Sequence, residues 1–143
     1  MVLSKKITIV EVLKPREYGL NQEIRWFSDS FGIFSSRDKE KSCYRLFLEL
    51  LKASKKNYLI SSDELAHMCH LSRGTTVHHL NKLMMTGIVI KQGKRYLLRV
   101  QTLSSLVNEI KKDLERLFLD IKESAEIIDK DLALKKEGSN PIE

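Results

Sequence analysis

One stretch of this chain combines positive charge with hydrogen-bonding side chains and contains no carboxylate. Between Glu64 and Glu109 there is no Asp or Glu, yet six Lys or Arg residues and all four histidines fall there. The same stretch contains the run Leu71-Ser72-Arg73-Gly74-Thr75-Thr76-Val77-His78-His79-Leu80. A carboxylate on a surface that binds a polyanion would repel phosphate. The residue types therefore predict binding chemistry directed at the phosphates and bases of a nucleic acid.

The side chains expected to contact DNA form two groups. If Thr76, Leu80 and Leu83 pack inward on one helix, its outward side carries the first group, in which Arg73 can bind O6 and N7 of guanine and Asn81 can pair with adenine. Hydroxyl groups at the helix start are better placed for phosphate. The first group is Ser72, Arg73, Gly74, Thr75, Val77, His78, Asn81 and Lys82, and the second, at a hairpin tip, is Lys91, Lys94 and Arg95. An ordinary solvated helix face is the alternative for each single residue, Asn81 above all.

A metal-sensing function is the alternative raised by the histidines and one cysteine. His67 and His70 are three residues apart, a workable ligand spacing, and Cys69 is a soft ligand suited to zinc. Cys69, however, points away from the face shared by the two histidines, and the chain has no Cys-x-x-Cys motif. We therefore expect no metal site and no cofactor.

Catalysis is not expected either. The chain lacks a phosphate-binding Gly-rich loop, a His-Glu-x-x-His motif and a recognisable nucleophile setting. The sequence predicts a binding protein, not an enzyme.

The elements that position these residues can be inferred from periodicity and capping signals. Leu20, Ile24, Phe27, Phe31 and Phe34 follow helical spacing, Ser61 and Glu64 form a capping box, and Gly93 suits a tight hairpin turn. The predicted elements are a strand at 5–13, helices at 20–34 and 38–53 (the second capped by Ser35 or Ser36), a very short strand at 58–60, helices at 62–70 and 73–85, and strands at 88–91 and 95–98.

The order helix, helix, turn, helix and basic hairpin predicts a winged helix-turn-helix domain. The expected fold class is mainly α with a small β-hairpin, that is, α+β. In such a domain the second helix of the turn motif enters the major groove and presents its first turns to the base edges.

The C-terminal part of the chain, from Leu103 to about Leu134, has a different period. Apolar residues recur every 11 positions, which corresponds to 3.67 residues per turn and a nearly straight apolar seam. A helix about 45 Å long cannot bury such a seam on a small domain alone, so we expect it to pair with a second copy. Folding back onto residues 20–34 is the alternative. The residues assigned to dimerisation are Leu103, Leu106, Ile110, Leu114, Leu117, Ile121, Ile128 and Leu132.

Length and composition bound the remaining possibilities. The 143 residues carry a net charge of +6 and only two cysteines, which suits a cytoplasmic protein in a reducing compartment. No apolar run approaches the length of a membrane span, and the N-terminus is too short and too polar for a signal peptide. The predicted organisation is an extension at 1–37, the DNA-binding domain at 38–101, the dimerisation helix at 102–135 and a flexible tail at 136–143.

The stretch Ser72 to Leu83, followed by Gly87-Ile88-Val89 and a basic hairpin, resembles winged-helix transcription regulators of the ArsR and MarR type, especially archaeal members. The resemblance covers about residues 40–100. It implies a dimeric repressor or activator that binds promoter DNA through the helix beginning near Ser72. Metal-sensing ArsR proteins carry a Cys-x-Cys motif where this chain has Ser61 and Asp63.

The sequence thus favours a sequence-specific regulator that binds double-stranded DNA as a homodimer, without a membrane partner and with no effector that can be named. A winged-helix adaptor in a transcription or membrane-remodelling assembly is the rival interpretation. A metal-responsive repressor and an RNA-binding protein are further alternatives. The absence of carboxylates from Leu65 to Asn108 favours a nucleic acid, because an adaptor has no reason to avoid acidic side chains there.

Overall fold

The structure is a computed structural model that describes Met1 and residues 5–32 and 41–137. The chain divides into two compact units, Met1–Leu106 and Val107–Glu143. The division falls inside the long C-terminal helix, so the first turn of that helix belongs to the first unit.

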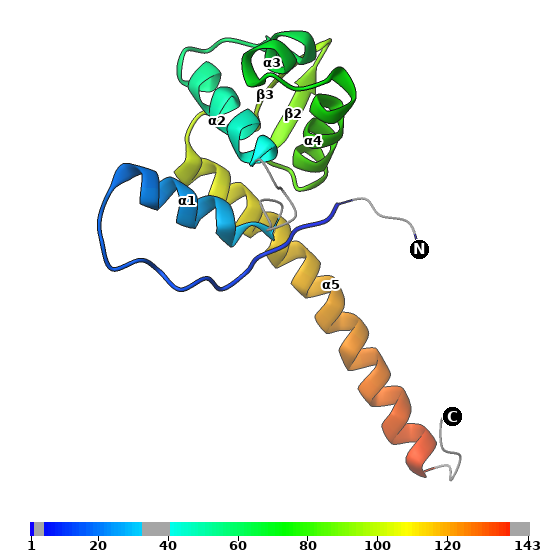
Figure 1. The fold of residues 1–143 in the computed structure, drawn as a ribbon. Coiled ribbons are helices and arrows are strands. Elements are labelled where there is room, and N and C mark those ends of the chain that lie inside the picture. Colours follow the sequence, from blue (N-terminus) through cyan, green and yellow to red (C-terminus); the bar gives the residue numbers. More distant parts are fainter. Residues whose placement is uncertain (2–4, 33–40, 138–143) are drawn as a thin grey trace. The chain divides into compact units, whose positions relative to one another are not determined.

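The described part of the chain is mainly helical and has one small antiparallel sheet, which confirms the α+β class (Figure 1). In chain order the elements are α1 (Leu20–Ser30), α2 (Ser42–Lys55), β1 (Ile60–Ser61), α3 (Ser62–Cys69), α4 (Arg73–Met85), β2 (Val89–Gln92), β3 (Arg95–Leu98) and α5 (Leu103–Glu137).

The core of the first unit lies between α2, α3, α4 and the sheet. From α2 it receives Phe47 and Leu50, and from α3 it receives Leu65, all with no exposed surface. The ring of Phe27 on α1 stacks on Phe47, with ring centroids 6.5 Å apart. Cys43 of α2 is also buried, whereas Leu51 of the same helix is only partly covered.

The sheet has the strand order β1-β3-β2. β3 is antiparallel to both of its neighbours. Val89 of β2 is paired with Leu98, and Ile60 of β1 is paired with Tyr96. Gly93 has φ +64° at the turn between β2 and β3, the positive φ that the sequence predicted for this position. The hairpin strands begin and end within one residue of their predicted limits.

A tight turn joins α3 to α4. His70 adopts the left-handed conformation, and the backbone N–H of Leu71 donates to the Ala66 carbonyl at 2.9 Å. This 6→1 bond closes α3 as a Schellman motif does. Arg45 of α2 donates from Nη1 to the Cys69 carbonyl at 2.9 Å, so α2 also satisfies an end carbonyl of α3.

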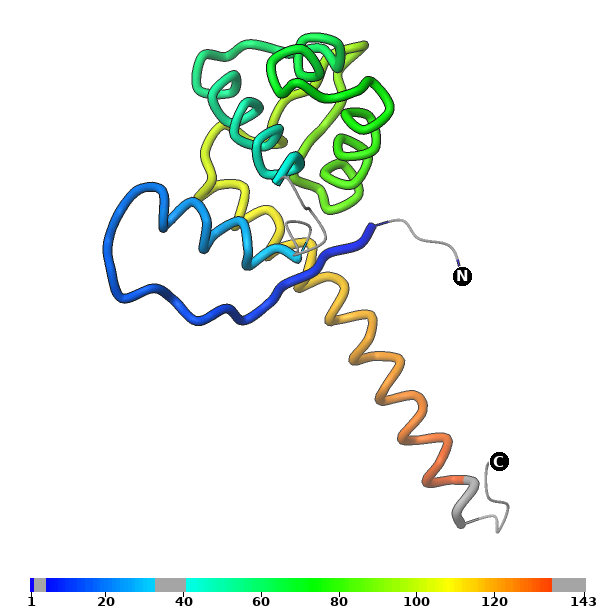
Figure 2. The backbone as a smooth tube through the Cα atoms, in the orientation of Figure 1, coloured from blue at the N-terminus to red at the C-terminus, as the bar shows by residue number. Residues whose placement is uncertain are grey.

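The strand predicted at 5–13 is wrong. These residues are extended but belong to no sheet, and Figure 2 traces them as a segment that leads into α1. Their backbone groups bond to helix ends instead: the N–H of Lys6 donates to Met85 at 3.1 Å, and that of Val10 donates to Ser30 at 2.8 Å. Alternating β-branched residues predict an extended backbone, but they do not reveal whether a strand edge lies beside it.

The first two helices are shorter at one end than predicted. α1 ends at Ser30, before Phe31, whereas the spacing had extended it to Phe34, which lies outside the described residues. α2 begins at Ser42, not at Asp38, and its predicted caps Ser35 and Ser36 also lie outside the described residues. The N-cap of α2 is Lys41, which has a φ of +52° and is therefore not part of the helix.

In the second unit, α5 runs to Glu137 as one helix, and the predicted tail at 136–143 falls mostly outside the described residues. Along the part of the chain that the structure describes, no helix is both long enough and apolar enough to cross a membrane.

Candidate nucleic-acid interface

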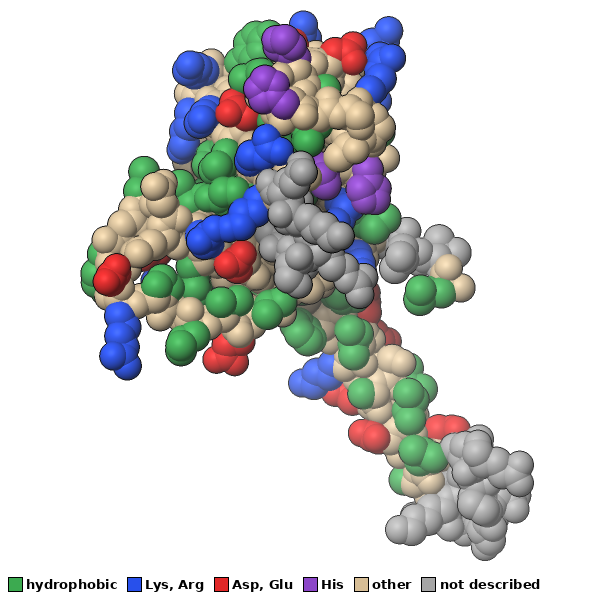
Figure 3. Space-filling model, viewed as in Figure 1, with side chains coloured by type: hydrophobic (Ala, Val, Ile, Leu, Met, Phe, Trp, Pro, Cys, Tyr) green, Lys and Arg blue, Asp and Glu red, His purple; other side chains and the backbone are tan. Residues whose placement is uncertain are grey.

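α4 divides into a buried and an exposed side, as the sequence predicted. Thr76, Leu80 and Leu83 have no exposed surface and hold the helix against the core. Among the predicted DNA contacts only Val77 is partly covered, and the exposed ones are Ser72, Arg73, Gly74, Thr75, His78, Asn81 and Lys82. In Figure 3 histidine side chains lie on the part of the visible face that α3 and α4 form.

The start of α4 has a capping hydroxyl and no acidic residue in its first turn. The Ser72 hydroxyl caps the helix by accepting from the Thr75 N–H at 3.1 Å, and the first turn contains no acidic residue. Its uncapped amides and the positive end of the helix dipole therefore face solvent without a carboxylate of their own turn. A Cβ added at Gly74 would meet no described atom within 4 Å, so the backbone is open to close approach there.

Arg73, the first residue of α4, pairs with Asp63 of α3. Its Nε lies 3.3 Å from Oδ1, and its Nη2 donates to Oδ2 at 3.5 Å. Both side chains are more than two-thirds exposed, at 78% and 71%. The pair therefore lies on the outer surface, where the guanidinium can also be reached by another molecule.

The three basic residues of the hairpin differ in what they contact. Lys91 and Lys94 are exposed, and the Lys91 ammonium lies 5.7 Å from the centre of the Tyr96 ring. The Arg95 guanidinium is instead held by the protein: Nη1 donates to the Leu59 carbonyl at 2.8 Å and lies 2.9 Å from Oε1 of Glu64. Contact of Arg95 with DNA stays a prediction, and the structure adds a role that the sequence did not reveal.

The Arg95 contacts are part of a small polar network at the start of α3. The Tyr58 hydroxyl donates to Oε2 of Glu64 at 2.7 Å, and the Ser61 hydroxyl bonds Oε1 at 3.1 Å. These hydrogen bonds, that of Tyr58 first, lower the pKa of Glu64 below its ordinary value, and Arg95 adds a smaller electrostatic contribution. The capping box predicted Glu64 as a helix-start residue, but Tyr58 and Arg95 as its partners were missed.

The histidines do not form one cluster. His79 is buried on α4, and its Nε2 lies 2.7 Å from the hydroxyl of Ser42 on α2, so it is a core residue. His67, His70 and His78 are exposed. Within residues 5–32 and 41–137, no group of three or more His, Cys, Asp or Glu side chains is arranged to hold a metal ion.

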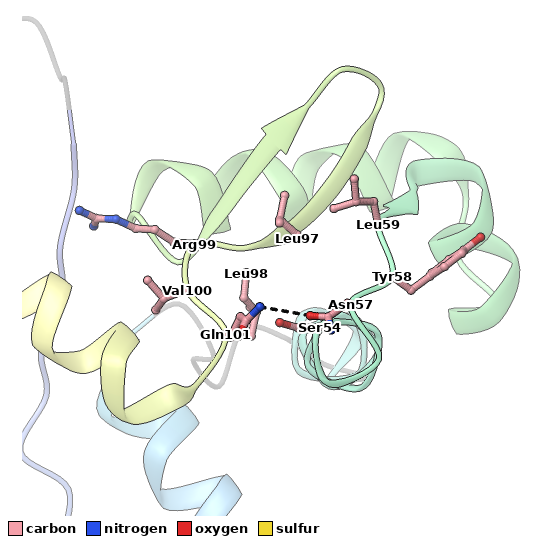
Figure 4. Close-up of a pocket in the computed structure, with 9 residues that line it drawn as sticks. All are labelled: Ser54, Asn57, Tyr58, Leu59, Leu97, Leu98, Arg99, Val100 and Gln101. Atoms are coloured by element: carbon pink, nitrogen blue, oxygen red, sulfur yellow. Dashed lines mark hydrogen bonds between the residues drawn. The ribbon is translucent and has the colours of Figure 1, made fainter.

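A shallow pocket lies beside the junction of β3 with the segment that follows it (Figure 4). Its volume is about 160 Å³, and Gln101 donates to Oδ1 of Asn57 across one side at 3.2 Å. Drug-sized ligands occupy pockets of about 300 to 1,000 Å³. The pocket is therefore too small to suggest an effector of that size.

The residues assigned to dimerisation fall in both units. Leu103 and Leu106 belong to the first unit, where Leu106 is fully buried, and Ile110 and Leu114 lie in the first turns of the second. Further along α5 the apolar side chains are exposed, and Figure 3 shows hydrophobic groups along this helix. The exposed fractions are 48% for Leu117, 54% for Ile121, 54% for Ile128 and 41% for Leu132.

Comparisons of this chain with the descriptions of known protein families, with curated proteins and with solved structures find no match.

Proposed function

We propose that this protein is a sequence-specific DNA-binding transcription regulator whose first unit contains a winged helix-turn-helix. In this proposal α3, the turn at Leu71 and α4 form the helix-turn-helix, and β2 and β3 form the wing. The observation that carries the proposal is the exposed side of α4. This side begins with a capped turn without acidic residues and continues with exposed polar and basic side chains, while the inner side of the helix is buried.

The proposed mechanism assigns different tasks to the two ends of α4 and to the wing. Ser72 and Thr75 at the helix start bind a backbone phosphate, together with the free amides of the first turn. Arg73 reads guanine and Asn81 reads adenine in the major groove. Lys91 and Lys94 lie against phosphates of the neighbouring groove, where their charge contributes affinity but little sequence preference.

The long helix α5 supplies the second part of the proposal, a homodimer. Leu117, Ile121, Ile128 and Leu132 keep the 11-residue spacing on a helix that exposes them. A continuous exposed apolar stripe of this kind marks an interaction surface. A second copy of α5 offers a stripe of the same period, and a two-fold dimer would present two α4 helices to two half-sites.

The resemblance of Ser72 to Leu83 to regulators of the ArsR and MarR type agrees with this proposal. The resemblance suggests a repressor or an activator that binds promoter DNA.

The proposal is tested by selection of duplexes from a pool of randomised DNA. Wild-type protein should enrich one sequence containing two related half-sites about one helical turn, or a multiple of it, apart. Genome-wide recovery of DNA crosslinked to the protein in its native cell should return the same sequence. Failure to enrich any sequence, with binding to duplex no better than to unrelated polyanions, would contradict the proposal and favour the adaptor interpretation.

A further inference from the structure

Only two carboxylates lie between residues 61 and 108, and they are neighbours at the start of α3: Asp63 and Glu64. Glu64 has a structural explanation, since it caps α3 through Ser61 and holds Arg95 and Tyr58. Asp63 has no such set of contacts. It is 71% exposed, and it contacts Arg73 at the start of the helix proposed to read DNA.

The geometry of this pair is side-on. The Asp63 carboxylate faces Nε and Nη2 of Arg73, at 3.3 and 3.5 Å. A guanidinium has five N–H groups in a rigid plane, so a carboxylate on the Nε and Nη2 edge leaves the edge formed by Nη1 and Nη2 available. That second edge is the one that can donate two parallel bonds to O6 and N7 of guanine.

We propose that Asp63 is a positioning residue for base readout: it fixes the plane of the Arg73 guanidinium so that its outer edge is presented to guanine. The inference rests on the proposed DNA-binding function. An arginine at the start of a helix has several free rotamers, and restricting them in advance lowers the entropy lost when the two bonds to guanine form.

A negative charge near phosphate weakens DNA binding, and a positioning role gives a reason for Asp63 to be present there. Exposed ion pairs add little to protein stability, so the pair has little value for folding alone. A lone carboxylate on a polyanion-binding surface would weaken binding to every sequence. Once DNA excludes water from the pair, the attraction between Asp63 and Arg73 strengthens, and the guanidinium can contact only a base that accepts two bonds from its outer edge.

Two variants separate positioning from charge. Asp63→Asn keeps the shape of the side chain but removes its charge, and Arg73→Lys keeps the positive charge but cannot form the fork. The control for loss of one acidic charge is Asp29→Asn, because Asp29 is an exposed residue of α1. The probes are a duplex of about 25 base pairs enriched by wild-type protein, long enough for two half-sites, and a scrambled duplex of the same composition.

The measured quantity is the ratio of affinities for the enriched and the scrambled duplex. Asp63→Asn should lower this ratio about tenfold, with the loss concentrated at one base pair of each half-site, while affinity for scrambled DNA stays equal or rises. Arg73→Lys should lower it similarly, and Asp29→Asn should leave it unchanged. In an Arg73→Ala background, Asp63→Asn should have no further effect on the ratio, because the group that it positions is gone.

Two results would overturn the inference. If Asp63→Asn raises both affinities by the same factor, Asp63 acts only as a repelling charge. If the ratio falls equally in the wild-type and Arg73→Ala backgrounds, Asp63 acts through another group, and thermal unfolding of the variant would then show whether that action is on the fold. A wild-type protein that enriches no sequence is a separate outcome, since it contradicts DNA readout itself.

Discussion

The guanidinium of Arg95 on β3 lies 2.9 Å from Oε1 of Glu64 on α3, and the two residues are 31 positions apart in the chain. Through this contact the turn end of the hairpin is linked to the first helix of the proposed helix-turn-helix. Arg95 also bonds the Leu59 carbonyl at 2.8 Å, which ties it to the segment before β1. The Arg95 side chain therefore adds to the backbone pairing of β3 with β1 a second connection between the hairpin and the start of α3.

This network predicts a pH dependence of stability. The pKa of Glu64 is lowered in the folded protein, so the unfolded chain binds its proton first as the pH falls. The stabilisation is present above the ordinary Glu pKa of 4.5 and is lost as the pH falls through the lower, folded value. Urea unfolding at a series of acidic pH values should show a steeper loss of stability for wild type than for Glu64→Gln. Parallel curves would show that Glu64 does not contribute to acid unfolding.

A second prediction concerns the contact between α2 and α4. Ser42→Ala removes the hydroxyl that lies 2.7 Å from Nε2 of buried His79. Losing one partner of a buried hydrogen bond should lower the free energy of unfolding by about 1 to 3 kcal/mol. Chemical denaturation measures this loss, and Ser104→Ala, at an exposed serine of α5, is the matched control. Equal stability of the two variants would mean that the bond adds nothing to the fold.

Much of α4 could be predicted because its signals are local. The spacing of Thr76, Leu80 and Leu83 identifies the inner side, and Ser72 followed by Thr75 identifies the start. Both features depend on residues within a few positions of each other. Over that distance helix geometry determines which side chains share a face and which hydroxyl caps the helix. The exposed side of the candidate site follows directly from that assignment.

The contacts between distant segments could not be predicted in the same way. The pairing of Ser42 with His79 spans 37 positions, and neither residue type indicates the other. The N-terminal residues 5–13 show the same limit, because their pattern predicts an extended backbone but not that Val10 bonds the end of α1. Arg95 was assigned to DNA from its charge, and its acceptors at Leu59 and Glu64 become visible only in three dimensions.

The dimer proposal predicts a difference between two leucines on opposite sides of α5. Leu117 lies on the 11-residue stripe, whereas Leu119, 67% exposed, lies off it. Leu117→Glu would bury a charge in the seam at a cost of several kcal/mol and should give monomers at micromolar concentration, while Leu119→Glu should remain dimeric. Light scattering measures the molar mass of each variant in solution and so its oligomeric state. Monomeric wild-type protein would contradict the dimer.

The positions of the histidines predict that no metal is bound. Purified protein should contain far less than one zinc ion per chain, and a chelator should leave DNA affinity unchanged. Elemental analysis and a binding titration check these expectations. Stoichiometric zinc that is lost in His67→Ala would instead support the metal-responsive alternative.

The central claim, that α4 reads DNA and the hairpin anchors it, is tested most directly by one titration. Wild type, Arg73→Ala and Lys94→Ala are each titrated with the enriched and the scrambled duplex at several salt concentrations. Arg73→Ala should cost about 1 to 3 kcal/mol on the enriched duplex and relax preference at one base pair. Lys94→Ala should weaken both duplexes alike and reduce the salt slope by about one unit. If Arg73→Ala leaves both affinity and preference intact, the helix that begins after Ser72 does not read DNA, and the adaptor interpretation becomes the better one.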